Sequence, residues 1–122
     1  MTCLVQIQQP SVWPCEPVRE LLDEPWASKL REGFVHGTLS KRGVTSRHPY
    51  EGGDQERELA AMYRQHAEAL CTSHPRTASA LTRLVDYYNH DALREDIDAR
   101  LSRVVATYRS LAAERVYHFG IR

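Results

Sequence analysis

The residues best suited to bind an anion are Arg42, Arg47 and His48, which lie in the basic stretch SKRGVTSRHPY at positions 40–50. Guanidinium and imidazolium groups donate charge-assisted hydrogen bonds to carboxylates and phosphates. The GxxxxGK(S/T) pattern that would wrap a nucleotide is missing. Two hypotheses remain open: the stretch is a solvated connector that pairs with nearby acids, or it contacts an acidic partner or ligand. In the second case a pocket for a small anion would be lined by Trp26, Tyr63 and His66.

A helix start is predicted directly after this stretch, at Gly52-Gly53-Asp54. Asp54 is expected to be the N-cap, with its carboxylate accepting hydrogen bonds from N–H groups of the first turn. The acidic residues that follow favour the positive end of the helix dipole, so an anion bound there would meet carboxylates. We therefore expect residues 40–53 to form a basic, glycine-containing loop, and the helix after it to be self-capped.

Two further pairs of residues have spacings that suggest chemistry. Asp86 and His90 are four residues apart, so on a helix they project from one side and could supply two metal ligands. Neither HExxH nor a Glu-x-x-His pair accompanies them, and no metal or cofactor is expected. Cys71 precedes His74 by three residues, a spacing that would suit a nucleophile and its base. The negative end of the helix dipole at a helix C-terminus, however, disfavours the thiolate. Cys15 lies at a helix start, where the positive end of the dipole favours the thiolate, but the acidic residue after it offsets part of that effect. No catalytic residue is therefore predicted.

Three helices are predicted in the first 72 residues from prolines, glycines and apolar spacing. A short helix lies in CEPVRELLDE, and a second begins near Pro25 and stops at Gly43. The inner stripe of the second helix would consist of Trp26, Leu30 and Phe34. A third helix spans 54–72. Its buried face would consist of Leu59, Met62, Tyr63, His66, Ala67 and Leu70.

The C-terminal part of the chain, from Pro75, contains neither proline nor glycine until Gly120, so helix is expected for most of it. One apolar set consists of Leu81, Leu84, Val85 and Tyr88. A second set, at steps of four, three, four and three, consists of Ile97, Leu101, Val104, Tyr108 and Leu111. Between them NHDALRED is mostly polar, which leaves either one long helix or two helices that meet near Asn89. The second set has no obvious partner of its own length in the chain, which favours an interface between two copies.

Composition narrows the classes of function. The chain has 122 residues, with 16 basic residues balancing 16 acidic ones, which fits one domain and gives no excess charge for nucleic acid or an anionic membrane. DNA binding ranks last, because the best candidate helix, 76–88, carries only Arg76 and Arg83. Apolar runs are too short to span a membrane. Three cysteines without paired spacing and a start unlike a signal peptide indicate a reducing, cytoplasmic setting of bacterial type.

The sequence therefore predicts an all-α domain over 1–122: a small bundle of four to five helices with a long C-terminal helical segment and an extended segment at 1–15. A short ribbon pairing residues 3–9 with 116–121 is a further hypothesis. The expected function is a non-enzymatic helical interaction or regulatory module, working as a homodimer or with a protein partner. The alternative is a small enzyme or anion-binding protein that uses the loop around Arg42.

Overall fold

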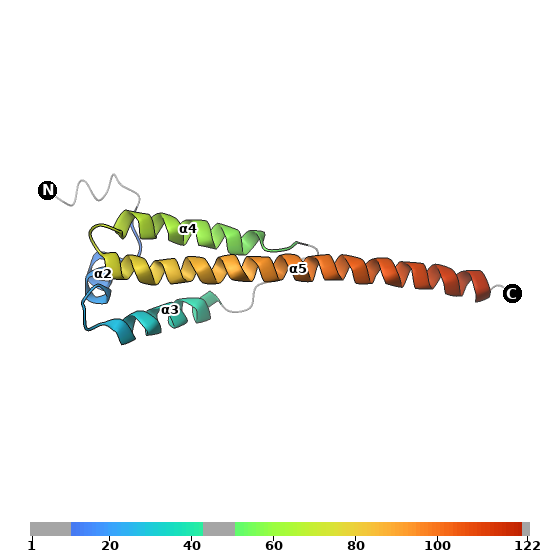
Figure 1. Cartoon of the computed structure of the whole chain (residues 1–122), viewed down its shortest axis with the longest axis horizontal. Helices are drawn as coiled ribbons and strands as arrows, with labels where there is room; N and C mark the ends of the chain where they lie inside the picture. Colours follow the sequence, from blue (N-terminus) through green and yellow to red (C-terminus); the bar gives the residue numbers. More distant parts are fainter. Residues whose placement is uncertain (1–10, 43–50, 121–122) are drawn as a thin grey trace.

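The computed structural model describes residues 11–42 and 51–120, with side chains described as far as Arg115. Within these ranges the chain forms four helices and no strand: α2 (Glu16–Leu22), α3 (Ser28–Arg42), α4 (Asp54–Leu70) and α5 (Pro75–Gly120). α5 is the spine of the molecule. α4 and α3 lie along its first half, above and below it in Figure 1, and α2 closes the end of the bundle near the start of α5. The predicted all-α bundle is confirmed.

The 46 residues of α5 form one uninterrupted helix, so the alternative of two helices meeting near Asn89 is wrong. At 1.5 Å per residue this helix is about 69 Å long. The helix also runs through most of the segment proposed as a strand, 116–121, because no residue before Gly120 interrupts it. The ribbon is therefore unsupported, and its other half, residues 3–9, lies outside the described residues.

The core is formed mainly between α4 and α5, whose predicted inner faces meet except at Met62, which is exposed and not buried as predicted. From α4 come Tyr63, Ala67 and Leu70, and from α5 come Leu81, Leu84, Val85 and Tyr88. The predicted stripe of α3 is wrong in part: Trp26 is 66% exposed and Leu30 is also exposed, whereas Val35 is buried. The reason is that α3 begins at Ser28, so Trp26 belongs to the turn before the helix, and the helix is rotated to bring Val35 toward α5.

Two helix N-termini are capped by acids from other parts of the chain. The N-cap of α4 is Gly53, and Asp54 is the first helical residue with no capping hydrogen bond from its side chain, so the prediction of Asp54 as a cap is wrong. The Gly53 N–H donates to Oδ1 of Asp96 on α5 at 2.9 Å. At α5, Oδ1 of Asp23 accepts from the N–H groups of Arg76 at 2.7 Å and Thr77 at 3.2 Å. Both caps tie a helix N-terminus to another part of the fold and also satisfy N–H groups that have no partner within their own helix.

The double glycine explains how α4 meets α5 so closely. Gly52 has φ +77°, a left-handed conformation that favours glycine. A Cβ added to Gly53 would lie 2.5 Å from Cα of Ala92 and 2.7 Å from its carbonyl carbon. The start of α4 therefore rests directly on the backbone of α5, and this junction marks the end of the bundle.

Beyond the junction α5 continues alone. Ala99 is its last buried residue among those whose side chains are described, and none from Arg100 to Arg115 is buried. The C-terminal part of the helix therefore projects from the bundle as a single rod (Figure 1).

Candidate functional site

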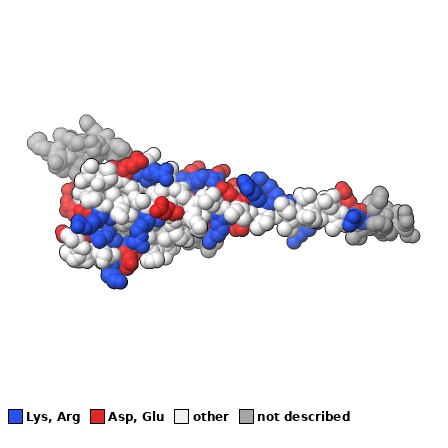
Figure 2. All heavy atoms as spheres, viewed as in Figure 1, with Lys and Arg blue, Asp and Glu red and all other residues white. Residues whose placement is uncertain are grey.

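The C-terminal half of α5, from Ile97 onward, carries a row of exposed apolar side chains, called here the C-terminal stripe. It consists of the five residues predicted as an interface, Ile97, Leu101, Val104, Tyr108 and Leu111, which are 51–70% exposed. Leu93 and Val105 beside the stripe are exposed as well. Monomeric proteins rarely leave large apolar side chains contiguous in water. The surface of the rod is correspondingly poor in charge over part of the face seen in Figure 2, while acidic and basic groups are interspersed over the bundle.

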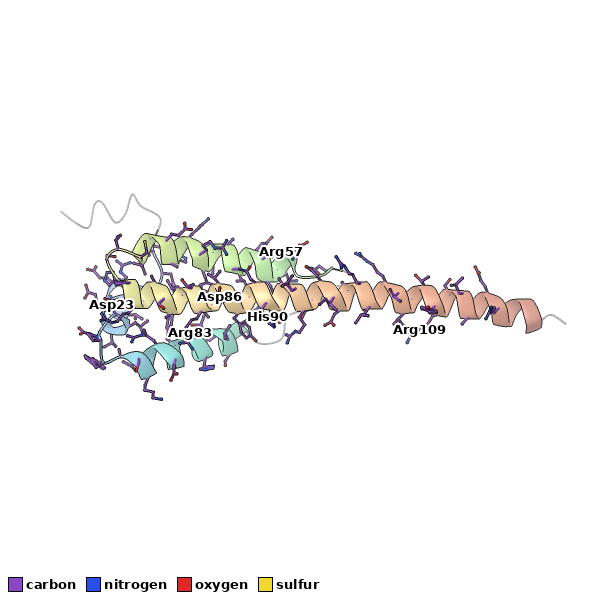
Figure 3. The ribbon with its side chains drawn as sticks, viewed as in Figure 1. Asp23, Arg57, Arg83, Asp86, His90 and Arg109 are labelled. Atoms are coloured by element: carbon purple, nitrogen blue, oxygen red, sulfur yellow. The ribbon has the colours of Figure 1, made fainter. Side chains whose placement is uncertain are left out.

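The stripe lies on the side of α5 that faces away from the bundle. Along the bundle, the residues that continue this side of the helix are Arg83, Asp86, His90 and Leu93, all exposed. The residues that α4 and α3 cover, Leu84, Val85 and Ala92 among them, lie on the opposite side. Figure 3 shows Arg83, Asp86 and His90 along α5, with Arg109 on the projecting part. A second helix could therefore lie along the stripe without displacing α3 or α4.

A second candidate site is an open pocket of about 920 Å³ between α3, α4 and α5, called here the aromatic pocket. Its aromatic walls are Trp13, Phe34, Tyr63 and Tyr88. The Trp13 ring lies 5.2 Å from Phe34 and 5.6 Å from Tyr63, centroid to centroid, and Tyr63 stacks on Tyr88 at 5.8 Å. A pocket with such walls suits a flat, largely apolar ligand.

Two cations, Lys41 and Arg42, line this pocket, and Arg42 already has a counter-ion. Its Nη2 donates to Oε1 of Glu56 at 2.8 Å, and the Glu56 side chain is fully buried. The guanidinium also lies 5.5 Å from the centre of the Tyr88 ring. Because a buried carboxylate needs its partner, Arg42 serves first to neutralise Glu56. This arrangement weakens the hypothesis of an anion site built on Arg42.

His66 links the pocket to the segment before α2. Its Nδ1 accepts a hydrogen bond from the backbone N–H of Trp13 at 3.1 Å, which requires that nitrogen to be unprotonated. Burial lowers the pKa of His66, so the neutral ring is favoured in the folded chain. Burial also raises the pKa of the Tyr63 hydroxyl. These two polar groups of the pocket, His66 and Tyr63, are therefore uncharged near neutral pH.

The structure brings together three of the six residues predicted for a ligand site. Arg42, Tyr63 and His66 line the aromatic pocket, whereas Trp26 lies outside it and Trp13 takes the expected place of that indole. Arg47 and His48 lie outside the described residues. Trp13 was missed because it precedes α2, between prolines, where no periodicity shows which way a side chain points.

The other candidate pairs do not assemble into sites. Asp86 and His90 are exposed on α5, and among the described residues no group of three metal-ligating side chains forms. Cys71 is exposed at the C-cap of α4, and Nδ1 of His74 is hydrogen-bonded to the Ser73 hydroxyl at 2.8 Å. The thiol and the imidazole therefore do not form a nucleophile–base pair in this arrangement.

No protein-family model, curated protein sequence or solved structure matches this chain. Of the helices that the structure describes, none combines the length and the apolar character needed to cross a bilayer, α5 included.

Proposed function

We propose that this protein is a helical interaction module that associates with a second copy of itself through the C-terminal stripe. The observation that carries the proposal is the exposure of all five stripe residues, four of which lie beyond Ala99, where α5 has left its bundle. In proteins, most helices owe their stability to packing of an apolar face against other elements, because the helix alone contributes little in water. A partner along the stripe would supply that packing.

The expected strength follows from the side chains involved. Burying an exposed Val, Leu or Ile side chain completely contributes roughly 1.5–3 kcal/mol, so the half-shielded stripe residues contribute about 1 kcal/mol each on docking. Ten of them, five from each copy, contribute on the order of 10 kcal/mol against ~4–15 kcal/mol of lost freedom on association. The proposed dimer is thus reversible, and its population depends on concentration.

A non-enzymatic role in a reducing cytoplasm belongs to the same proposal. Cys15 and Cys71 are both exposed as free thiols, which suits a compartment that keeps thiols reduced. The function of such a module would be to bring two bundles, and whatever each bundle contacts, into one particle.

The test is the mass of the protein in solution at increasing concentration. We expect twice the chain mass of 14.0 kDa to appear, and a single-chain mass that persists to about 100 μM, where a complex of only ~5.5 kcal/mol would be populated, would refute the proposal. Leu101→Glu combined with Tyr108→Glu should give a monomer whose bundle still melts cooperatively. Ser110→Glu is the matched control, because Ser110 is exposed on the other side of the same helix and its substitution should leave the dimer intact.

A second candidate function is binding of a small planar ligand in the aromatic pocket, favoured by the four aromatic walls around one opening. Trp13 provides the readout, once Trp26→Phe has removed the other indole. A set of flat apolar compounds should change Trp13 fluorescence saturably, and Tyr63→Ala should abolish the change. Linear, non-saturating quenching by every compound would exclude a defined site.

A further inference from the structure

We infer that two copies of α5 pair in antiparallel orientation, with the two-fold axis level with Ala106 and the two bundles at opposite ends of the particle. This inference rests on the proposed function and concerns the geometry of the same surface. The orientation and the register are both argued from the charged residues that flank the stripe.

A parallel arrangement places like charges in the seam. The steps of four and three along the stripe are those of alternating core positions in a coiled coil. Extended by one step at each end, the same pattern reaches Arg94 and Arg115. In a parallel pair each core residue meets its own copy, so Arg94 would face the partner's Arg94 and Arg115 the partner's Arg115. Repulsion at both ends of a short seam disfavours this orientation.

An antiparallel arrangement about Ala106 pairs the apolar residues with one another. A residue a given number of positions before the axis faces the residue the same number after it in the partner. Leu101 then faces the partner's Leu111, and Val104 faces the partner's Tyr108. Ile97 faces the partner's Arg115, whose long stem can cover it while the guanidinium reaches water. The segment from Ile97 to Arg115 is centred on Ala106, so each stripe is covered along its whole length.

The flanking charges are complementary in this register. Arg100 and Glu114, both exposed, lie on the same edge of the stripe. Arg100 is level with the partner's Ala112, so the partner's Glu114 lies two positions away along the axis, about 3 Å. On the other edge Asp98 lies beside the partner's Arg115. Each contact occurs twice by symmetry. A shift by one heptad would instead place the partner's Thr107 beside Arg100 and the partner's Tyr108 beside Asp98, so neither of these two ion pairs would form. The charges therefore select the register centred on Ala106.

Charge reversal tests the pairing directly, with dimer dissociation constants measured by sedimentation equilibrium. Arg100→Glu and Glu114→Arg should each weaken the dimer roughly tenfold, since each removes two ion pairs and creates two repulsions. The double variant should return to within about threefold of the wild type, because the reversed pairs attract again. Arg109→Glu, outside the seam, is the control for net charge and should have little effect.

The rescue is diagnostic because the two residues cannot interact within one chain. Fourteen positions separate Arg100 from Glu114, which is about 21 Å along a helix and well beyond the ~8 Å screening length at physiological ionic strength. Loss of the local attraction between Arg100 and Asp96 would affect Arg100→Glu and the double variant alike. If the double variant is as weak as the product of the two singles while the wild type dimerises, the register is wrong and the proposed function stands.

Cysteine cross-linking gives an independent answer about orientation. In a chain with Cys3, Cys15 and Cys71 changed to Ser, Leu101→Cys together with Leu111→Cys should form a disulfide-linked dimer under mild oxidation, and neither single substitution should. A dimer linked through Leu101→Cys alone would show a parallel pair and overturn the inference. Linkage through Ile97→Cys with Tyr108→Cys in preference would show the shifted register and overturn it too. A wild type that remains a single chain at every concentration would instead remove the proposed function itself.

Discussion

Replacing Gly53 by alanine should destabilise the fold by driving the start of α4 away from α5. The added Cβ would lie 2.5 Å from Cα of Ala92, still closer to the Ala92 carbonyl oxygen, and in a space that real Cβ atoms do not occupy. The obstructing atoms are backbone in the middle of a long helix, so no side-chain rotation can relieve the contact. Either α4 shifts outward or α5 bends.

The cost follows from what that shift breaks. Overpacking of this kind typically costs ~1–3 kcal/mol, and alanine is also a poorer N-cap than glycine. Moving Gly53 away also lengthens its hydrogen bond to Asp96. In a domain of about this size each kcal/mol lowers the melting temperature by roughly 3–6 °C, so the loss is readily measured by thermal denaturation followed by circular dichroism.

Gly33→Ala is the matched control, because the chemical change is identical and the surroundings are open. Gly33 lies inside α3, and a Cβ there would meet nothing within 4 Å. Alanine in an exposed helix interior is expected to stabilise by ~0.5–1 kcal/mol. The two variants should therefore change stability in opposite directions. A Gly53→Ala protein as stable as the wild type would show that α4 does not rest on the backbone of α5.

Three further outcomes are expected. Glu56→Ala should lose about 3 kcal/mol in urea denaturation by leaving Arg42 without its counter-ion, whereas Glu58→Ala, exposed on α4, should stay within ~0.5 kcal/mol of the wild type. Because burial lowers the pKa of His66, the unfolded chain binds the proton more readily, so the unfolding free energy should fall as pH drops through about 6.5. His66→Gln should flatten that dependence, and an unchanged pH profile would contradict the role assigned to the ring. Hydrogen bonds from Arg57 and from the Gly53 N–H lower the pKa of Asp96, so the Asp96 carboxylate stabilises the fold above about pH 4 and this stabilisation is lost as acid protonates it. Asp96→Asn should reduce the acid-induced loss of unfolding free energy, measured between about pH 2 and 5.

The sequence predicts this structure well where a feature depends on residues within the same turn or helix. Pro25, the glycines and Pro75 mark the limits of α3, α4 and α5 to within a few residues, because these residues act on the backbone of their own turn. The spacing of Leu81, Leu84, Val85 and Tyr88 predicts one buried face of α5 for the same reason. The exposure of the C-terminal stripe is less easily foreseen. Its pattern resembles that of a buried face, and only the lengths of α3 and α4 show that neither reaches it.

Two of the predictions that failed, Trp26 as a wall of the pocket and Asp54 as a cap, concern contacts made across the fold. Trp13 lines the pocket in place of Trp26 because the segment before α2 folds back onto α4, where its N–H meets His66, 53 positions away. The cap of α4 comes from Asp96, 43 positions away, and leaves Asp54 to pair with Arg57 at 2.6 Å. No turn or periodicity encodes such pairs.

The sequence by itself determined the helices, their approximate limits and the inner face of α5, since each depends on interactions within one or two turns. Tertiary structure decided which acid caps which helix, which arginine neutralises the buried Glu56, and which apolar face stays in water. Those outcomes depend on how closely the helices approach and on where each one ends relative to its neighbours. These are properties of the packed bundle, in which Gly53 can touch Ala92 only because α4 and α5 are already side by side.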